Sequence, residues 1–349
     1  MEMENLTLFE QLEQLRITSS SQIPPHDFLY TWNEVPCFAR GELVAVTGKA
    51  KSGKTYLNSI LMAAAGGDDV LGLKRAGEKP LRVVWIDTEQ SEDSTHEILR
   101  DRIGAMMGAE ASDEAYHVFN LRQIRWQDRM TLVLAAIAIC MPDLVIFDGI
   151  RDVVGDINNY EEAQNTIGQL LKVASEYKTC IVCVLHQNKA VEDKTLRGAL
   201  GTELQNKSFE TYECKKDPET RIFSIQQTAT RKYDMPNRID FCLTTDGLPV
   251  ACEVPQNASL SGAPAVRTEK ASFNPEYLTS DGKIDKVQLF GYILADGRKM
   301  ALPQLRQVVM KVANIQSFNF AFRVIDEAHT AGLVQTLKEG TNTYYQLVT

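Results

Sequence analysis

Short apolar runs alternate with longer amphipathic stretches from Gly41 to Leu243. The short runs are rich in β-branched residues, which is typical of strands, and the longer stretches have helical spacing. Strands that alternate with helices build βαβ units, so we expect an α/β fold with a mostly parallel sheet covered on both faces. The expected strands are Leu43–Thr47, Leu81–Ile86, His117–Asn120, Leu144–Phe147, Cys180–Leu185, Thr211–Lys215, Phe223–Ala229 and Ile239–Leu243. The expected helices follow Lys54 and span Asp93–Met107, Trp126–Cys140 and Tyr160–Tyr177.

The pattern changes on either side of this region. Residues 1–20 place Leu6, Phe9, Leu12 and Leu15 near helical spacing, and a connector rich in Ser and Pro follows. Residues 251–274 are rich in Pro, Ser, Ala and Asn, which is typical of a linker. We therefore expect a helix and connector over residues 1–35, the α/β domain over 36–250, and a separate module over 275–349.

The C-terminal segment has its own order of elements. The expected helices and strands are Lys283–Leu294, Leu302–Val312, Asn319–Ala331, Leu333–Leu337 and Thr343–Leu347. A polar turn that contains glycine separates the two strands, as in a hairpin. Three helices followed by a hairpin predict a small winged-helix-like domain.

Composition and charge narrow the class of protein. The chain has 349 residues, 44% of them hydrophobic and 24% charged, with a net charge of −9. It contains no apolar stretch of the roughly 18–20 residues that a membrane helix needs, and the acidic N-terminal segment does not resemble a signal peptide. We therefore expect a cytoplasmic protein without a membrane partner. The acidic balance means that any contact with nucleic acid must come from local basic patches.

The seven cysteines are not expected to form disulfides. Seven is an odd number, and a chain of this size does not need a disulfide framework. Cys180 and Cys183 lie three apart in one expected strand, so their side chains should face opposite sides of the sheet. We expect them to be buried thiols and not a metal site.

A phosphate-binding motif follows the first strand of the α/β region. Its residues are Gly48, Lys49, Ala50, Lys51, Ser52, Gly53, Lys54 and Thr55, and Tyr56 continues into the helix. This is the complete pattern G-x-x-x-x-G-K-[ST] between a strand and a helix. The two glycines let backbone N–H groups point at phosphate oxygens, and the helix N-terminus favours the negative charge. Lys54 is expected to bind the β- and γ-phosphates of ATP, and the Thr55 hydroxyl to bind Mg²⁺.

Acidic residues end two of the expected strands. Asp148 follows four apolar residues, which is the Walker B pattern, so we expect it to reach the Mg²⁺. Glu89 follows the strand that ends near Asp87, and a carboxylate there can activate the attacking water. Asp87 itself is interpreted either as part of the site or as a structural cap of its strand.

The chain resembles the RecA/DnaB-type P-loop ATPases, and most of all the plasmid-type hexameric replicative helicases of mobile elements. The stretches that carry the resemblance are Pro36–Leu43, Thr88-Glu89, Asp148–Asn159, Leu185–Lys189 and Leu196–Gly201. It covers about residues 35–245. It implies a RecA-like AAA ATPase domain that assembles as an oligomer, hexameric rings being usual in that group.

The resemblance also implies roles for individual residues. His186 or Gln187 would sense the γ-phosphate, and Arg231 or Lys232 would be a basic finger for a neighbouring ATP site. The loop over residues 187–205 would face DNA, most naturally single-stranded. Its basic residues are Lys189, Lys194 and Arg197.

Three functions remain open at this point. The first is a Mg-ATP hydrolase of the helicase or translocase kind, with Lys54, Glu89, Asp148, His186 and Arg231 as its catalytic residues. The second is an ATP-switched accessory protein that binds DNA, or replication or mobilisation proteins, without unwinding. The third is a small-molecule kinase. The late strands and the placement of Arg231 and Lys232 argue against it, because a kinase more often has an arginine-rich lid helix. The C-terminal module has nearly balanced charges, so docking on protein or on DNA both remain open for it.

Overall fold

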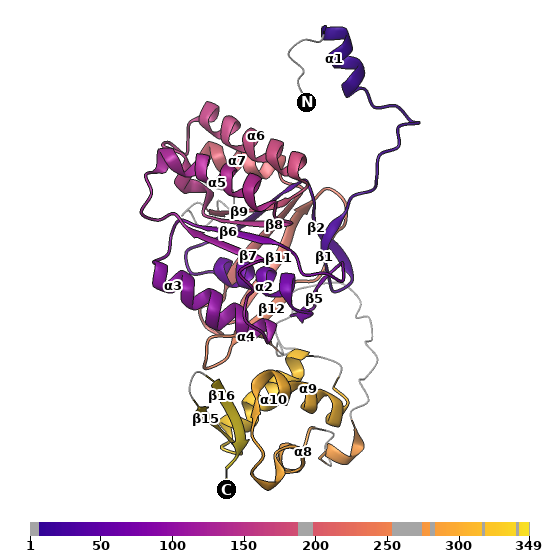
Figure 1. The fold of residues 1–349 in the computed structure, drawn as a ribbon, viewed down its shortest axis with the longest axis vertical. Helices are drawn as coiled ribbons and strands as arrows, with labels where there is room; N and C mark the ends of the chain where they lie inside the picture. Colours follow the sequence, from indigo (N-terminus) through magenta and orange to yellow (C-terminus); the bar gives the residue numbers. More distant parts are fainter. Residues whose placement is uncertain are drawn as a thin grey trace.

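The centre of the molecule is a nine-stranded sheet with the order β13-β12-β11-β10-β3-β9-β8-β6-β7 (Figure 1). The computed structural model describes residues 7–187, 198–252, 274–279, 283–315, 318–339 and 342–348. The strands are β3 (Leu43–Gly48), β6 (Val83–Asp87), β7 (Tyr116–Asn120), β8 (Leu144–Asp148), β9 (Cys180–His186), β10 (Glu210–Lys216), β11 (Phe223–Thr230), β12 (Ile239–Leu243) and β13 (Pro249–Ala251). Strands from β10 to β7 are parallel, and those from β10 to β13 are antiparallel. The predicted α/β fold with a mostly parallel sheet is therefore confirmed.

Helices cover both faces of this sheet (Figure 1). One face packs against α2 (Lys54–Gly66) and the helical run that ends in α4 (Gly104–Met107). The other packs against α5 (Trp126–Cys140), α6 (Tyr160–Tyr177) and α7 (Gly198–Lys207). Cys180 belongs to the first core and Cys183 to the second. The prediction that these two thiols face opposite sides is confirmed.

The helix predicted over Asp93–Met107 is not a regular α-helix. It consists of α3 (Glu92–Glu97), a π-helical segment η1 (Ile98–Ile103) and α4. Ile98 and Ile103 are buried in η1, and the wider turn also brings the Arg102 guanidinium 4.4 Å from the centre of the Tyr56 ring. The apolar periodicity predicts a helix here, but the buried Ile98 and Ile103 lie five residues apart, which is the spacing of a π-helical turn.

A second, small sheet corrects the predicted boundary of the α/β domain. Residues 28–35, expected in a connector, lie in strand β1 (Phe28–Trp32) and its turn, and β1 pairs with β2 (Val35–Ala39) and β5 (Leu73–Arg75). The fourth strand of this sheet is β4 (Asp69–Val70). Tyr30 and Trp32 are fully buried, and the Trp32 indole donates to the Leu71 carbonyl over 2.9 Å. Large apolar surface thus places this segment in the core.

Within the part of the N-terminal segment that the structure describes, only a short helix is present. It is α1 (Leu8–Leu15), and it begins in a capping box between Thr7 and Glu10. None of its residues is buried, and α1 lies apart from the rest of the chain (Figure 1). The predicted helix over residues 1–20 is therefore shorter than expected where it can be followed, because Arg16 is already extended.

Residues near the C-terminus form a module with a core of its own. Its helices and strands are α8 (Lys286–Ile293), β14 (Met300–Ala301), α9 (Leu302–Ala313), α10 (Phe318–Thr330), β15 (Val334–Glu339) and β16 (Asn342–Leu347). The three strands make an antiparallel sheet with the order β14-β16-β15. Helix α10 lies against β13 and β4 of the α/β domain. The elements thus follow the predicted order, with β14 in addition.

Candidate nucleotide-binding and hydrolysis site

The phosphate-binding motif forms the turn between β3 and α2. A Cβ atom on Gly48 would lie 2.3 Å from Ser52 Oγ and 2.4 Å from the Cys214 carbonyl oxygen, so no other residue fits. Gly53 has φ +103° and a Cβ there would lie 2.8 Å from the Phe223 ring. Gly53 is also the N-cap of α2, and it brings no side chain to the first N–H groups of that helix. These groups can therefore bind the phosphates of a nucleotide.

Lys54 lies at the start of α2, with its side chain folded back over the motif. Its ammonium donates to the carbonyls of Gly48 (3.2 Å) and Lys49 (3.0 Å), and it lies 3.1 Å from His186 Nδ1. Burial lowers the pKa of Lys54, and the charge of Asp148 opposes that shift. These contacts hold the ammonium at the mouth of the loop.

His186 joins Lys54 to Glu89. Because an ammonium can only donate, His186 Nδ1 must accept, and the ring proton then belongs on Nε2. Nε2 lies 3.2 Å from Glu89 Oε1 and donates to it. This hydrogen bond lowers the pKa of Glu89, so Glu89 is a carboxylate at neutral pH. The predicted sensor and the predicted base are thus in direct contact, and both remain partly exposed, at 38% and 43% of their side chains.

Asp148 is the last residue of β8, and His186 is the last residue of the neighbouring strand β9, so both lie at the same edge of the sheet. The register pairs Asp148 with Val184, and Gly48 with His186. Burial, and after it the charges of Glu89 and Asp87, raise the pKa of Asp148 to about 7. A carboxylate whose charge is this poorly compensated fits a divalent cation, and oxygen ligands are those that Mg²⁺ prefers. Asp148 and the Thr55 hydroxyl, at the start of α2, are the residues that would hold it.

Asp87 is structural. Its carboxylate is fully buried and accepts hydrogen bonds from the backbone N–H groups of Glu89 and Gln90, both over 3.1 Å. It also accepts from the Gln90 amide (3.0 Å) and the Thr95 hydroxyl (2.7 Å). With four donors, Asp87 holds the turn that carries Glu89, so the second of the two interpretations applies.

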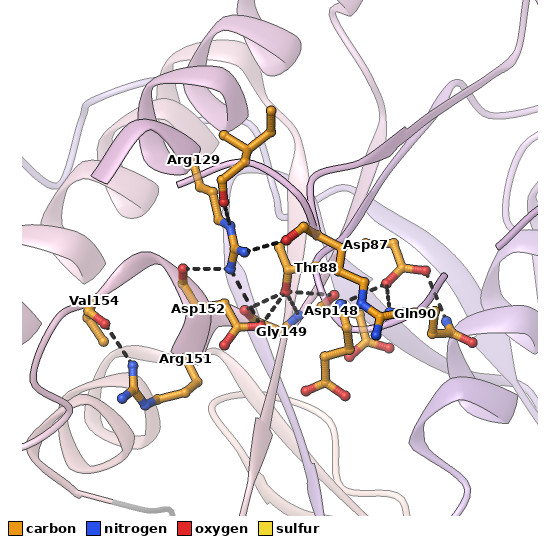
Figure 2. Close-up of polar contacts among 12 residues, drawn as sticks. Asp87, Thr88, Gln90, Arg129, Asp148, Gly149, Arg151, Asp152 and Val154 are labelled. Carbon is orange, nitrogen blue, oxygen red and sulfur yellow. Dashed lines mark hydrogen bonds and ion pairs between the residues drawn. The ribbon is translucent and has the colours of Figure 1, made fainter. Parts of the chain in front are cut away.

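Other residues of the site were not expected from the sequence. Asn58, one turn after Thr55 on α2, donates from its amide to Asp148 Oδ2 over 2.9 Å and is fully buried. A polar residue in the apolar face of α2 is a signal that sequence reasoning could have used. Figure 2 shows a second group, Thr88, Arg129, Gly149 and Asp152, behind the carboxylates. No spacing in the sequence points to it, since its members lie up to 64 residues apart.

The structure does not bring Arg231 to this site. Arg231 follows β11, whose last residue Thr230 pairs with Glu210, which in turn pairs with Val44 near the start of β3. The basic pair therefore lies at the opposite end of the sheet from Gly48. The Arg231 guanidinium donates to the carbonyls of Ser208 (3.1 Å) and Asn206 (2.9 Å). Within one chain Arg231 cannot touch the bound nucleotide.

The predicted DNA loop is largely outside the described residues. Lys189, Lys194 and Arg197 fall in residues 188–197, which lie outside them. The residues on either side are described: Gln187 donates from its amide to Glu213 Oε1 over 2.8 Å, and residues 198–205 belong to α7. Gln187 is therefore engaged with β10, which leaves His186 as the polar residue of this strand that meets Glu89.

The described residues contain neither a cluster of metal ligands nor a membrane-spanning helix. No group of three or more His, Cys, Asp or Glu side chains with metal-binding geometry occurs in that part of the chain. Among the helices that the structure describes, none has the length and apolar character needed to cross a membrane.

Comparisons with known proteins place the chain in a family. No curated protein matches its sequence. Among solved structures, the KaiC-like protein PH0186 from Pyrococcus horikoshii OT3 is similar over 61% of this chain and 90% of its own, with 10% identity and a TM-score of 0.42. A family model described as an AAA domain, AAA_25, matches residues 18–192, which include the P-loop, Glu89, Asp148 and His186. With its P-loop and mostly parallel sheet of the RecA-like kind, the chain belongs to this AAA domain family.

Proposed function

We propose that this P-loop ATPase hydrolyses Mg-ATP between the subunits of an oligomer and that it acts on DNA. The observation that carries the hydrolysis is the contact series Lys54–His186–Glu89 beside Asp148, at the carboxyl end of the parallel strands. It combines a phosphate-binding cation, a carboxylate of lowered pKa and a buried carboxylate fit for Mg²⁺.

Each residue of the site has a separate role in the proposed reaction. The N–H groups of the P-loop and Lys54 bind the phosphates, and Lys54 must leave the Gly48 and Lys49 carbonyls to do so. Thr55 and Asp148 hold Mg²⁺, which neutralises charge on the phosphates when bound. Glu89 orients and deprotonates the attacking water. His186 lies between Lys54 and Glu89, so a displacement of Lys54 changes the hydrogen bond that His186 makes with the base.

The position of Arg231 supports assembly. An exposed arginine next to the P-loop could serve its own nucleotide, whereas Arg231 lies at the far end of the sheet. In a head-to-tail ring or filament, the far end of one subunit meets the ATP site of the next. Arg231 then supplies a positive charge to the γ-phosphate of the neighbour. The resemblance to hexameric helicases of mobile elements agrees with a ring.

The DNA substrate rests on the same resemblance and on the loop over residues 187–205. A winged-helix-like C-terminal module, with three helices and the sheet β14-β16-β15, is the second element that we propose for a macromolecular contact. For a protein that acts on the DNA of a mobile element, the localisation that we propose is the cytoplasm.

One observation favours the second candidate, an ATP-switched accessory protein. On α10, which would be the recognition helix of a winged-helix module, Arg323 lies 3.9 Å from Glu327 and 4.8 Å from the centre of the Phe320 ring. His329 packs against Tyr345. These side chains face protein groups, which suits docking on protein. Ser317 and Asn319 are further candidates of the expected third helix for such a contact, but Ser317 and the side chain of Asn319 lie outside the described residues.

The test is the ATPase rate with and without single-stranded DNA, measured together with the size of the particle in nucleotide. DNA-stimulated turnover in a nucleotide-dependent oligomer, lost in Lys54→Ala, is the expected result. Slow turnover by a monomer, unchanged by DNA, would reject the oligomeric DNA-dependent motor and favour the accessory protein. Phosphate transfer to a small molecule in place of water would identify a kinase.

A further inference from the structure

Thr88 connects the ends of strands β6 and β8, because it directly precedes Glu89 and its backbone bonds to that of Asp148. Its backbone N–H donates to the Asp148 carbonyl over 2.8 Å, and its hydroxyl accepts from the Gly149 N–H over 2.9 Å. The same hydroxyl donates its proton to Asp152 Oδ2 over 2.8 Å (Figure 2). Thr88 is 4% exposed, so these bonds are shielded from water.

Arg129 fixes the acceptor of that hydroxyl. Its guanidinium projects from the first turns of α5 with 12% of the side chain exposed. It donates to the Asp152 carbonyl over 3.1 Å, and its charge lies 3.8 Å from Asp152 Oδ2. It also donates to the carbonyls of Ile124 (2.9 Å) and Arg122 (3.0 Å), in the loop after β7. One arginine therefore ties Asp152 to a rigid helix and to that loop.

The contacts from Arg129 through Asp152 to Thr88 lead to the backbone of the two proposed catalytic carboxylates, Glu89 and Asp148. Glu89 follows Thr88 directly, and its N–H is held by Asp87. On the opposite strand, Gly149 follows Asp148, and a Cβ on Gly149 would lie 3.2 Å from Glu89 Oε1. The hydroxyl of Thr88 thus sets how far the backbone of Glu89 lies from that of Asp148 and Gly149.

We propose that Thr88, Asp152 and Arg129 are positioning residues for ATP hydrolysis, which hold Glu89 and Asp148 at their working separation without touching the nucleotide. The inference rests on the proposed ATPase function. Misplacement of a catalytic group by about 1 Å costs roughly 10²-fold in rate, so a single hydroxyl at this point can control turnover. Binding of the phosphates by the P-loop and Lys54 does not depend on this group.

The test is the isosteric Thr88→Val substitution, which removes the hydroxyl and leaves the Asp152 carboxylate and the Gly149 N–H without this partner. We expect kcat for ATP to fall about 10–100-fold while KM stays within about threefold, since the lost contact orients groups and binds no phosphate. Thr88→Ser, which keeps the hydroxyl, is expected to restore kcat to within about threefold of the original. Thr131→Val, the same change on the exposed side of α5, is the matched control and leaves both constants unchanged.

The outcomes distinguish a failure of the ATPase function from a failure of the positioning role. Turnover of the unaltered chain no higher than that of Lys54→Ala would reject the ATPase function, and the positioning role with it. Normal turnover that Thr88→Val leaves unchanged, or changes only in KM, would overturn the positioning role alone. Equal losses in Thr88→Val and Thr88→Ser, in step with a lower melting temperature, would show a merely structural residue.

A second variant keeps the proposal testable if Thr88→Val does not fold. Asp152 has 33% of its side chain exposed, and Asp152→Asn keeps an oxygen for the Thr88 hydroxyl but loses the charge near Arg129. We expect kcat to fall about 3–10-fold at an unchanged KM, because the acceptor is retained but less well fixed. An unchanged kcat in this folded variant would contradict the role of Arg129 and Asp152.

Discussion

The two ends of the parallel strands treat polar side chains in opposite ways. At the carboxyl end, His186 and Glu89 bond to one another and keep 38% and 43% of their side chains exposed. At the amino end, Glu210 is 1% exposed and accepts from the Phe38 N–H and the Tyr212 hydroxyl, both over 3.0 Å. His186 and Glu89 at the first end can therefore exchange partners for a ligand, whereas Glu210 at the second end is a fixed part of the core.

Arg231 is the exception at the amino end, because it is exposed and its guanidinium donates to the carbonyl oxygens of Ser208 and Asn206. Glu42 is a carboxylate that feels its charge, and an exposed guanidinium can still attract an anion. In the proposed assembly, ligand exchange would belong to the carboxyl end of one subunit and a charge contribution to the amino end of the next.

The largest expected effect is at the carboxyl end. Glu89→Gln removes the base but keeps an oxygen for His186 Nε2, so nucleotide binding should persist. We expect kcat to fall about 10³-fold, within the range for loss of a general base. Single-turnover hydrolysis and nucleotide affinity measure the two effects, with the exposed Glu92→Gln as control. A fall below tenfold would mean that another group activates the water.

Arg231→Ala is expected to have the next largest effect, about 10²-fold in kcat, as for the loss of one charged donor at a reacting phosphate. The affinity of an isolated subunit for nucleotide should not change, since Arg231 lies away from its own P-loop. Mixing Arg231→Ala with Lys54→Ala subunits should restore turnover, because some interfaces then combine an intact P-loop with an intact arginine.

The mixing experiment tests whether the amino end of one subunit and the carboxyl end of another form one ATP site. Recovery above the sum of the separate variants requires that the residues come from different subunits. If the mixture stays as inactive as its components while mixed oligomers form, the amino end does not complete the site, and the comparison fails.

The sequence predicts those residues of the site whose positions follow from the order of the strands in the sheet. Gly48 and Asp148 are predicted by their motifs and His186 by the resemblance, and the three lie at one edge because the carboxyl ends of parallel strands meet there. Arg129 and Asp152 were not predicted, because their contact depends on how α5 and the segment after β8 pack. The hairpin of β1 was missed for a local reason: Asn33 and Glu34 make its turn at φ +48° and +69° without a glycine.

Glu210 allows a prediction of stability at the amino end. Burial raises its pKa from 4.5 to about 7. A carboxyl of raised pKa is protonated in the folded chain where the unfolded chain ionises, so its contribution is complete below pH 4.5 and is lost as the pH rises through 7. This difference corresponds to about 3 kcal/mol. We expect the free energy of unfolding to decrease between pH 5 and 8, and Glu210→Gln to weaken that dependence.

Urea denaturation across this pH range measures the effect, with the exposed Glu219→Gln as the matched control. An equal slope for Glu210→Gln and the unaltered chain would show that Glu210 ionises without penalty. The amino end would then be less rigid than the comparison requires.

The smallest effect is expected for Lys232, the neighbour of Arg231 and the other residue considered for the finger. Its ammonium lies 5.2 Å from the centre of the Tyr233 ring and 5.8 Å from that of Phe28. Exposed cation–π contacts contribute about 0.5–1 kcal/mol, so Lys232→Ala should lower the free energy of unfolding by no more than that. Turnover should stay unchanged, since the two rings already hold the charge against its own subunit. A loss of turnover equal to that of Arg231→Ala, restored by the same mixing with Lys54→Ala, would instead assign the finger to Lys232.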